Sequence, residues 1–251
     1  MNEPQPRQEV CHVTNGAGRI EVRTDRREAC ALFVNGQARA LDWWGNNGSI
    51  LHDLMLPKAE YSIEWQAQFR QVVEHGVDSN RSMASQFSSV LHLFPSGNYT
   101  LTLAPISGED DWIDIHDWYY WNPGGYYPHD AYKGKTFVPT LPDTALSDER
   151  ILEFAYQIEA GARPIMITVS AANSSSIAPG SWIEFIVDGH HKSMGYFIAK
   201  VKPWRLLIEA ASPRLLTYED WPLPKETIPR SWQIQFGRNK NGEIIEQEKT
   251  P

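Results

Sequence analysis

The chain has 251 residues, a length that fits one large domain or two small ones at about 150 residues per domain. Its formal net charge is −8, which argues against a nucleic-acid-binding surface because affinity for phosphates depends on Lys and Arg. Hydrophobic residues make up 41% of the chain. This composition supports a folded core and excludes disordered, collagen-like and coiled-coil proteins.

No run of about 18 apolar residues occurs, so no transmembrane segment is predicted. The first ten residues contain no apolar stretch that would mark a secretory signal. The two cysteines, Cys11 and Cys30, are too few for a disulfide framework and are predicted to be free thiols of a cytoplasmic protein. The predicted organisation is a flexible N-terminal arm (1–17), a single all-β domain (18–245) and a frayed C-terminal tail (246–251).

Apolar residues recur at every second position through most of the chain, which is the period of a half-buried strand. In chain order, this pattern predicts strands at residues 20–22, 31–33, 61–69, 99–103, 152–158, 165–169, 183–187, 197–201, 206–208 and 232–236. Apolar residues also lie four positions apart within 61–69, so a helix remains an alternative there.

Turn-forming residues separate these runs at the intervals typical of a sheet. The turns are predicted at Asn35-Gly36, Ser96-Gly97-Asn98, 160–164, Asp188-Gly189 and Asn241-Gly242. The turn at Asp188-Gly189 indicates a hairpin with His190 and His191 at its exposed tip. The predicted fold class is therefore all-β: an antiparallel β-sandwich or a lipocalin-like barrel with long loops and little helix.

The segment 109–135 has an unusual composition. Of the twenty Trp and Tyr residues in the chain, eight lie within 112–132. Residues 82–132 also hold six acidic residues and no Lys or Arg. Two Gly and two Pro in 121–130 predict a shaped loop, and such loops often carry function.

If residues 112–120 form a strand, alternate side chains share one face. That face carries Trp112, Asp114, His116, Trp118 and Tyr120. A carboxylate and an imidazole between indoles pack poorly as core but suit a ligand site. The alternative is that the aromatic residues only cover the edge of a sheet.

We predict Asp114, His116 and Asp117 as catalytic residues, because neighbouring carboxylate and imidazole groups can exchange protons. The predicted substrate-binding residues are aromatic or imidazole side chains of the same segment: Trp112, Trp118, Tyr119, Tyr120, Trp121, Tyr126, Tyr127 and His129.

No transition-metal motif is present, and no cofactor is predicted apart from a candidate calcium ion. Glu109, Asp110 and Asp111 place hard oxygen ligands close together, as calcium requires. Their spacing is not that of an EF-hand, and a solvated acidic loop is the alternative.

The sequence favours a cofactor-free enzyme that acts on a small apolar or polycyclic molecule, by isomerisation, cyclisation or hydrolysis, in an aromatic-lined pocket. The main alternative is a carbohydrate-binding, lectin-like β-sandwich, with calcium as a possible stabiliser. A membrane-surface protein and a protein-interaction module remain open as well. The expected partner is a small-molecule or glycan ligand, with no nucleic acid.

Overall fold

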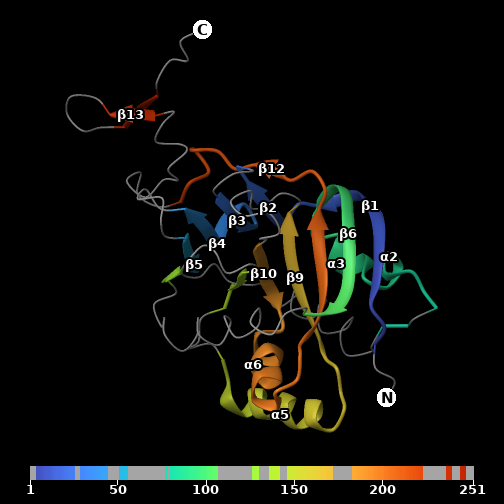
Figure 1. Ribbon diagram of the computed structural model, residues 1–251. Helices are drawn as coiled ribbons and strands as arrows, with labels where there is room; N and C mark the ends of the chain where they lie inside the picture. The colour runs from blue at the N-terminus through green and yellow to red at the C-terminus, as the bar shows by residue number, and fades with distance from the viewer. Residues whose placement is uncertain are drawn as a thin grey trace.

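Strands predominate over helices in the structure, which confirms the predicted mainly β class with little helix. The computed structural model describes residues 4–25, 29–44, 51–55, 77–78, 80–106, 126–129, 136–141, 146–171, 183–222, 236–238 and 244–246. Most of the described strands belong to two six-stranded sheets, which we call sheet A and sheet B (Figure 1). Neither sheet closes on itself in the described part of the chain, so the architecture is a sandwich rather than a barrel.

Sheet A combines strands that lie far apart in the sequence. Its spatial order is β1 (Arg7–Ala17), β6 (Pro95–Pro105), β11 (Trp204–Ala210), β9 (Ile165–Ala171), β10 (Ile183–Asp188) and β8 (Thr136–Pro139). The pairs β9–β11 and β8–β10 are parallel, so the sheet is mixed rather than antiparallel throughout as predicted. Helical connections explain this difference, because parallel neighbours need a long crossover that a tight turn cannot supply.

Sheet B is built largely from consecutive strands. Its order is β12 (Arg214–Leu215), β2 (Ile20–Thr24), β3 (Ala29–Val34), β4 (Gln37–Trp44), β5 (Leu51–Met55) and β7 (Tyr126–His129). The predicted turn at Asn35-Gly36 joins β3 to β4 and is confirmed, since φ is 51° at Asn35 and 76° at Gly36. Positive φ at both central residues is what a two-residue hairpin turn requires. A separate pair, β13 (Phe236–Arg238) and β14 (Ile244–Glu246), brackets the predicted turn at 241–242, which lies outside the described residues.

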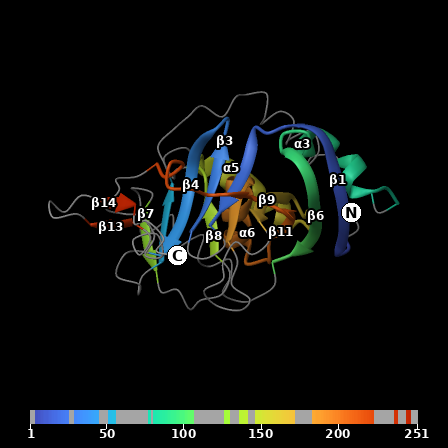
Figure 2. The same cartoon turned by 90° about the horizontal axis from the view of Figure 1, so that it is seen from above.

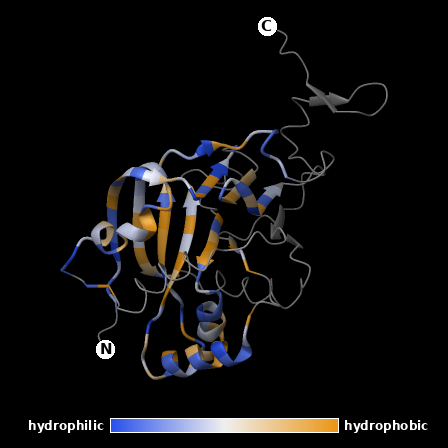
Figure 3. Ribbon diagram, turned by 180° about the vertical axis from the view of Figure 1, so that it is seen from behind, coloured by the Kyte–Doolittle hydropathy of each residue, from blue (hydrophilic) through white to orange (hydrophobic). Residues whose placement is uncertain are grey.

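The main hydrophobic core lies between the inner faces of the two sheets. Leu101, Val169 and Ile208 of sheet A and Leu32 of sheet B belong to one buried cluster. Two one-turn helices, α2 (Met83–Gln86) and α3 (Ser88–Leu91), add Met83 and Val90 to it, and Phe87 between them is also part of the cluster. Seen from above, β3 and β4 lie on one side of the molecule and β6 and β1 on the other (Figure 2). Apolar positions follow the strands, as Figure 3 shows.

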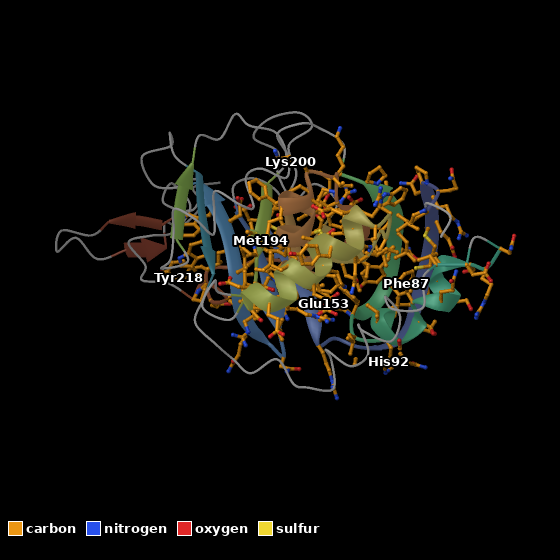
Figure 4. The ribbon with its side chains drawn as sticks, turned by 90° about the horizontal axis from the view of Figure 1, so that it is seen from below. Phe87, His92, Glu153, Met194, Lys200 and Tyr218 are labelled. Atoms are coloured by element: carbon orange, nitrogen blue, oxygen red, sulfur yellow. The ribbon has the colours of Figure 1, made fainter. Side chains whose placement is uncertain are left out.

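Two longer helices pack together at one end of the sheet A strands (Figure 1). They are α5 (Asp148–Glu159), which carries Glu153, and α6 (His190–Ala199), which carries Met194 (Figure 4). Close packing requires Gly195, because a Cβ there would lie 2.8 Å from Cβ of Phe154.

Both longer helices replace predicted strands. The strand predicted at 152–158 is wrong, since Ile151, Ala155 and Ile158 form the buried stripe of α5 at helical spacing. The Ser147 side chain accepts a hydrogen bond from the Arg150 amide and thus caps this helix. The hairpin at Asp188-Gly189 and the strand at 197–201 are also wrong, because Gly189, with φ of 102°, begins α6.

Two further local predictions differ from the structure. Ser96-Gly97-Asn98 lies inside β6 rather than in a turn. Residues 7–17, expected in a flexible arm, form β1 and pair along β6. Side chains of β1 also hold the start of α2, because the Glu9 carboxylate accepts hydrogen bonds from the Ser82 hydroxyl and the Met83 amide, both at 2.6 Å. These tertiary contacts order a segment whose own sequence has only a weak strand pattern.

The described thiols are free, as predicted: Cys11 is half-buried in β1 and Cys30 is buried in β3. Burial raises the pKa of both thiols above the usual value. A raised pKa keeps a thiol protonated and poorly nucleophilic, so neither group is a candidate nucleophile.

Candidate functional site

Most of the aromatic and acidic segment chosen from the sequence lies outside the described residues. This applies to the predicted catalytic residues, to the calcium candidates and to most of the substrate-binding residues: Asp114, His116, Asp117, Glu109, Asp110, Asp111, Trp112, Trp118, Tyr119, Tyr120 and Trp121. Their assignments therefore stay predictions.

The remaining three predicted residues, Tyr126, Tyr127 and His129, lie in β7. The loop prediction for 121–130 is therefore wrong at residues 126–129. Strand β7 pairs with β5, with Tyr127 opposite Asp53, and Asp53 in turn lies opposite Asp42 of β4. Sheet B thus brings two aspartate positions into register with a predicted ligand-binding tyrosine.

Among the residues that the structure describes, no three His, Cys, Asp or Glu side chains are grouped as metal ligands. The described helices also include none that is long and apolar enough to cross a membrane.

The most extensive polar arrangement among the described side chains is on the outer face of sheet A, the face turned away from sheet B. Leu206 and Ile208 of β11 belong to the core, so the alternate residues Arg205 and Glu209 lie on this outer face. Glu209 is flanked on the neighbouring strands by Thr100 of β6 and Ser170 of β9. Sequence reasoning recognised β11 but not the charged residues on its second face.

A buried ion pair spans three strands of this face. The Arg205 guanidinium donates from Nε to Oε2 of Glu184 at 2.6 Å and from Nη2 to Oε1 at 2.8 Å. Thr168, on the strand between them, donates its hydroxyl to Glu184 Oε2 at 2.7 Å. Arg205 and Glu184 are 5% and 1% exposed, so the pair is held in a fixed geometry away from water.

Glu209 differs from Glu184 in exposure and in partners. It is half-buried, whereas Glu184 and Arg205 are buried. Burial raises the pKa of Glu209, and the negative charge of Glu184 raises it further. The face therefore holds one buried carboxylate in an ion pair and a second, partly exposed carboxylate whose pKa is raised.

A second polar cluster lies where β10 meets α6. His190 is buried, and its Nε2 accepts a hydrogen bond from the Thr140 amide at 3.0 Å. Lys192 donates from Nζ to the Asp188 carboxylate at 2.7 Å and to the Ile165 carbonyl at 3.0 Å. The prediction that His190 lies at an exposed hairpin tip is wrong, because the helix turns its first residue inward.

Burial lowers the pKa of His190 to about 3, against the opposing effect of the nearby Asp188 charge, while His191 and Lys192 lower it further. A neutral imidazole is therefore part of the folded state. The unfolded chain binds a proton near pH 6.5, so stability should fall as the pH decreases from 6.5 towards 3.

We expect the variant His190→Gln to show a shallower loss of stability at acid pH than the wild type. The difference should reach about 1.4 kcal/mol per pH unit, the limit for one proton. Urea unfolding at several values between pH 4 and 7 measures it. The matched control is His92→Gln, since His92 is exposed. Equal pH slopes for His190→Gln and the wild type would contradict the assignment.

The outer face of sheet A was missed because no local motif marks it. Its four polar residues, Arg205, Glu209, Glu184 and Thr168, come from three strands, and the one available signal was a charged residue at alternate positions of a predicted strand. Comparisons of this chain with models of protein families, with curated proteins and with solved structures found no match.

Proposed function

We propose that this protein is a cofactor-free enzyme that transforms a small molecule by general acid–base catalysis on the outer face of sheet A, with Glu209 as the proton-transferring group. The observation that carries the proposal is a half-buried carboxylate beside a covered, hydrogen-bonded ion pair. Glu209 is the member of this set that combines partial exposure with a carboxylic acid.

The chemistry follows from the two environments. A carboxyl group whose pKa is raised towards the working pH donates a proton and then accepts one back, which is typical of general acid–base catalysis. Arg205 and Glu184 are positioning residues in this proposal. Their paired hydrogen bonds hold the Glu184 charge in place, and that charge adds to the effect of burial in raising the pKa of Glu209.

The proposal also assigns roles to residues of the aromatic segment 109–135. Asp114, His116 and Asp117 are retained as further candidates for proton transfer, and the Trp and Tyr residues around them as groups that bind the substrate. The proposed setting is the cytoplasm, where a reducing environment suits two free thiols.

We expect Glu209→Gln to reduce turnover by about 10²–10⁴-fold, because glutamine keeps the shape of the side chain but cannot transfer a proton. The assay incubates the chain with a panel of small polycyclic, hydroxylated and ester-containing compounds and detects products by mass spectrometry. The turnover of Asp114→Asn and His116→Ala is measured in the same assay.

The matched control is Glu219→Gln, because Glu219 is an exposed carboxylate away from the sheet A strands. It should leave turnover unchanged. Full activity in Glu209→Gln would remove Glu209 from the proposal, and full activity in Asp114→Asn and His116→Ala would do the same for the aromatic segment. Binding of a saccharide with no turnover by the wild type would favour the alternative function, a carbohydrate-binding module.

A further inference from the structure

We infer that the outer face of sheet A takes an uncharged, hydroxyl-rich ligand of the saccharide type and discriminates against anions. This inference deepens the proposed function, since it names the class of molecule for the same site. It depends on which charges of the face are available to a ligand and on which hydrogen-bonding groups surround Glu209.

The positive charge of Arg205 on this face is paired with the buried Glu184 carboxylate. Arg205 is the only Lys or Arg on the outer face among the described strand residues of sheet A. Its Nε and Nη2 both donate to Glu184, and the residue is 5% exposed. A phosphate or carboxylate ligand would have to compete with a buried bidentate partner, and breaking such a pair leaves a charge uncompensated.

The described side chains next to Glu209 on β6 and β1 include uncharged hydroxyl and amide groups. Thr100 lies opposite Glu209, and Thr102 lies two residues further along β6, both half-buried. Gln8 of β1 lies opposite Thr102, is exposed, and is 3.4 Å from its hydroxyl. Hydroxyl and amide side chains both donate and accept hydrogen bonds, which matches the hydroxyl groups of a sugar.

Strands β1 and β6 carry exposed or half-buried side chains next to Glu209. Val10 of β1 is 74% exposed beside Thr100. An apolar residue among hydroxyls suits a sugar ring, whose C–H face is apolar and whose edge is polar. Among the described strand residues of this face, an anion would find no unpaired Lys or Arg side chain to bind.

The test titrates the full chain, uniformly labelled with ¹⁵N, with matched neutral and anionic probes at pH 7. The pairs are galactose with galacturonate, glucose with glucose 6-phosphate, and lactose with lactobionate. We expect the neutral member of at least one pair to bind about tenfold more tightly, with the largest amide shifts in β6 and β11. Tighter binding of the anionic members, or no binding of any neutral member, would overturn the inference.

Variants of the hydroxyl side chains test whether the ligand binds on the outer face of sheet A. Thr100→Val and Thr102→Val keep the side-chain shape and remove a hydroxyl, so each should weaken binding about fivefold. Ser89→Ala, which removes an exposed hydroxyl of α3 on the core side of the sheet, is the control and should bind as the wild type does. Unchanged binding in both site variants would also overturn the inference. Neutral sugars that bind selectively but are never converted would leave the inference standing and refute the proposed enzyme activity.

Discussion

Replacing Arg205 with methionine is expected to lower the free energy of unfolding by about 3–5 kcal/mol. Within the described part of the chain, Arg205 supplies two of the three side-chain hydrogen bonds that Glu184 accepts, and Glu184 is 1% exposed. The substitution removes the charged partner, and the Thr168 hydroxyl is then the remaining side-chain donor to this buried carboxylate among the described residues. Equilibrium unfolding in urea at pH 7 gives the value.

The double variant Arg205→Met with Glu184→Leu should recover most of that loss, because two apolar side chains replace the whole ion pair. A matched control on the surface is Arg150→Met. Arg150 pairs with Glu153 on α5, with both side chains nearly half exposed, so the loss should stay below about 1 kcal/mol. A single variant Arg205→Met as stable as Arg150→Met would show that the outer-face pair is not desolvated as described.

Replacing Gly189 with alanine is expected to destabilise the protein by about 2–4 kcal/mol. Two effects add. The backbone φ of 102° is unfavourable for any L side chain, and a Cβ at this position would lie 2.9 Å from Cγ and 3.0 Å from Cα of Met166. Thermal and urea unfolding measure the loss.

The chain offers a control that separates these effects. Gly161 has a similar φ of 95°, but a Cβ there meets nothing within 4 Å. Gly161→Ala should therefore cost only the backbone strain, about 1–2 kcal/mol. Equal losses in the two variants would mean that the close approach of Gly189 to Met166 contributes nothing.

Alternation of apolar residues identified the strands that carry the core. Strands β2, β3, β6, β9, β10 and β11 all contain a predicted run, because each has one face against the main core and the period of two is visible in the sequence. The same rule failed in 152–158, where Leu152 and Tyr156 are exposed and the buried residues follow the period of a helix. Apolar residues at alternate positions therefore imitate a strand pattern when some of them lie on the solvent-exposed side of a helix.

Pairing between distant strands was not predictable in this way. Nothing local in Arg7–Ala17 shows that it pairs with β6, and nothing local in 204–210 shows that this strand lies between β6 and β9. The outer-face site depends on that arrangement, since Arg205 meets Glu184 only across β9. The sequence drew attention to the aromatic residues near position 120, whereas the proposed site depends on the order of the strands in sheet A.

The central place of β11 in sheet A also affects how the chain folds during synthesis. Sheet B contains a local meander, β2 to β5, that can form as soon as its residues leave the ribosome. Sheet A cannot join β6 to β9 until residues 204–210 have been made, so its inner apolar face stays without its final partners through most of translation. Expression at lower temperature or with added chaperones should therefore increase the yield of correctly assembled protein more than stabilising sheet B would.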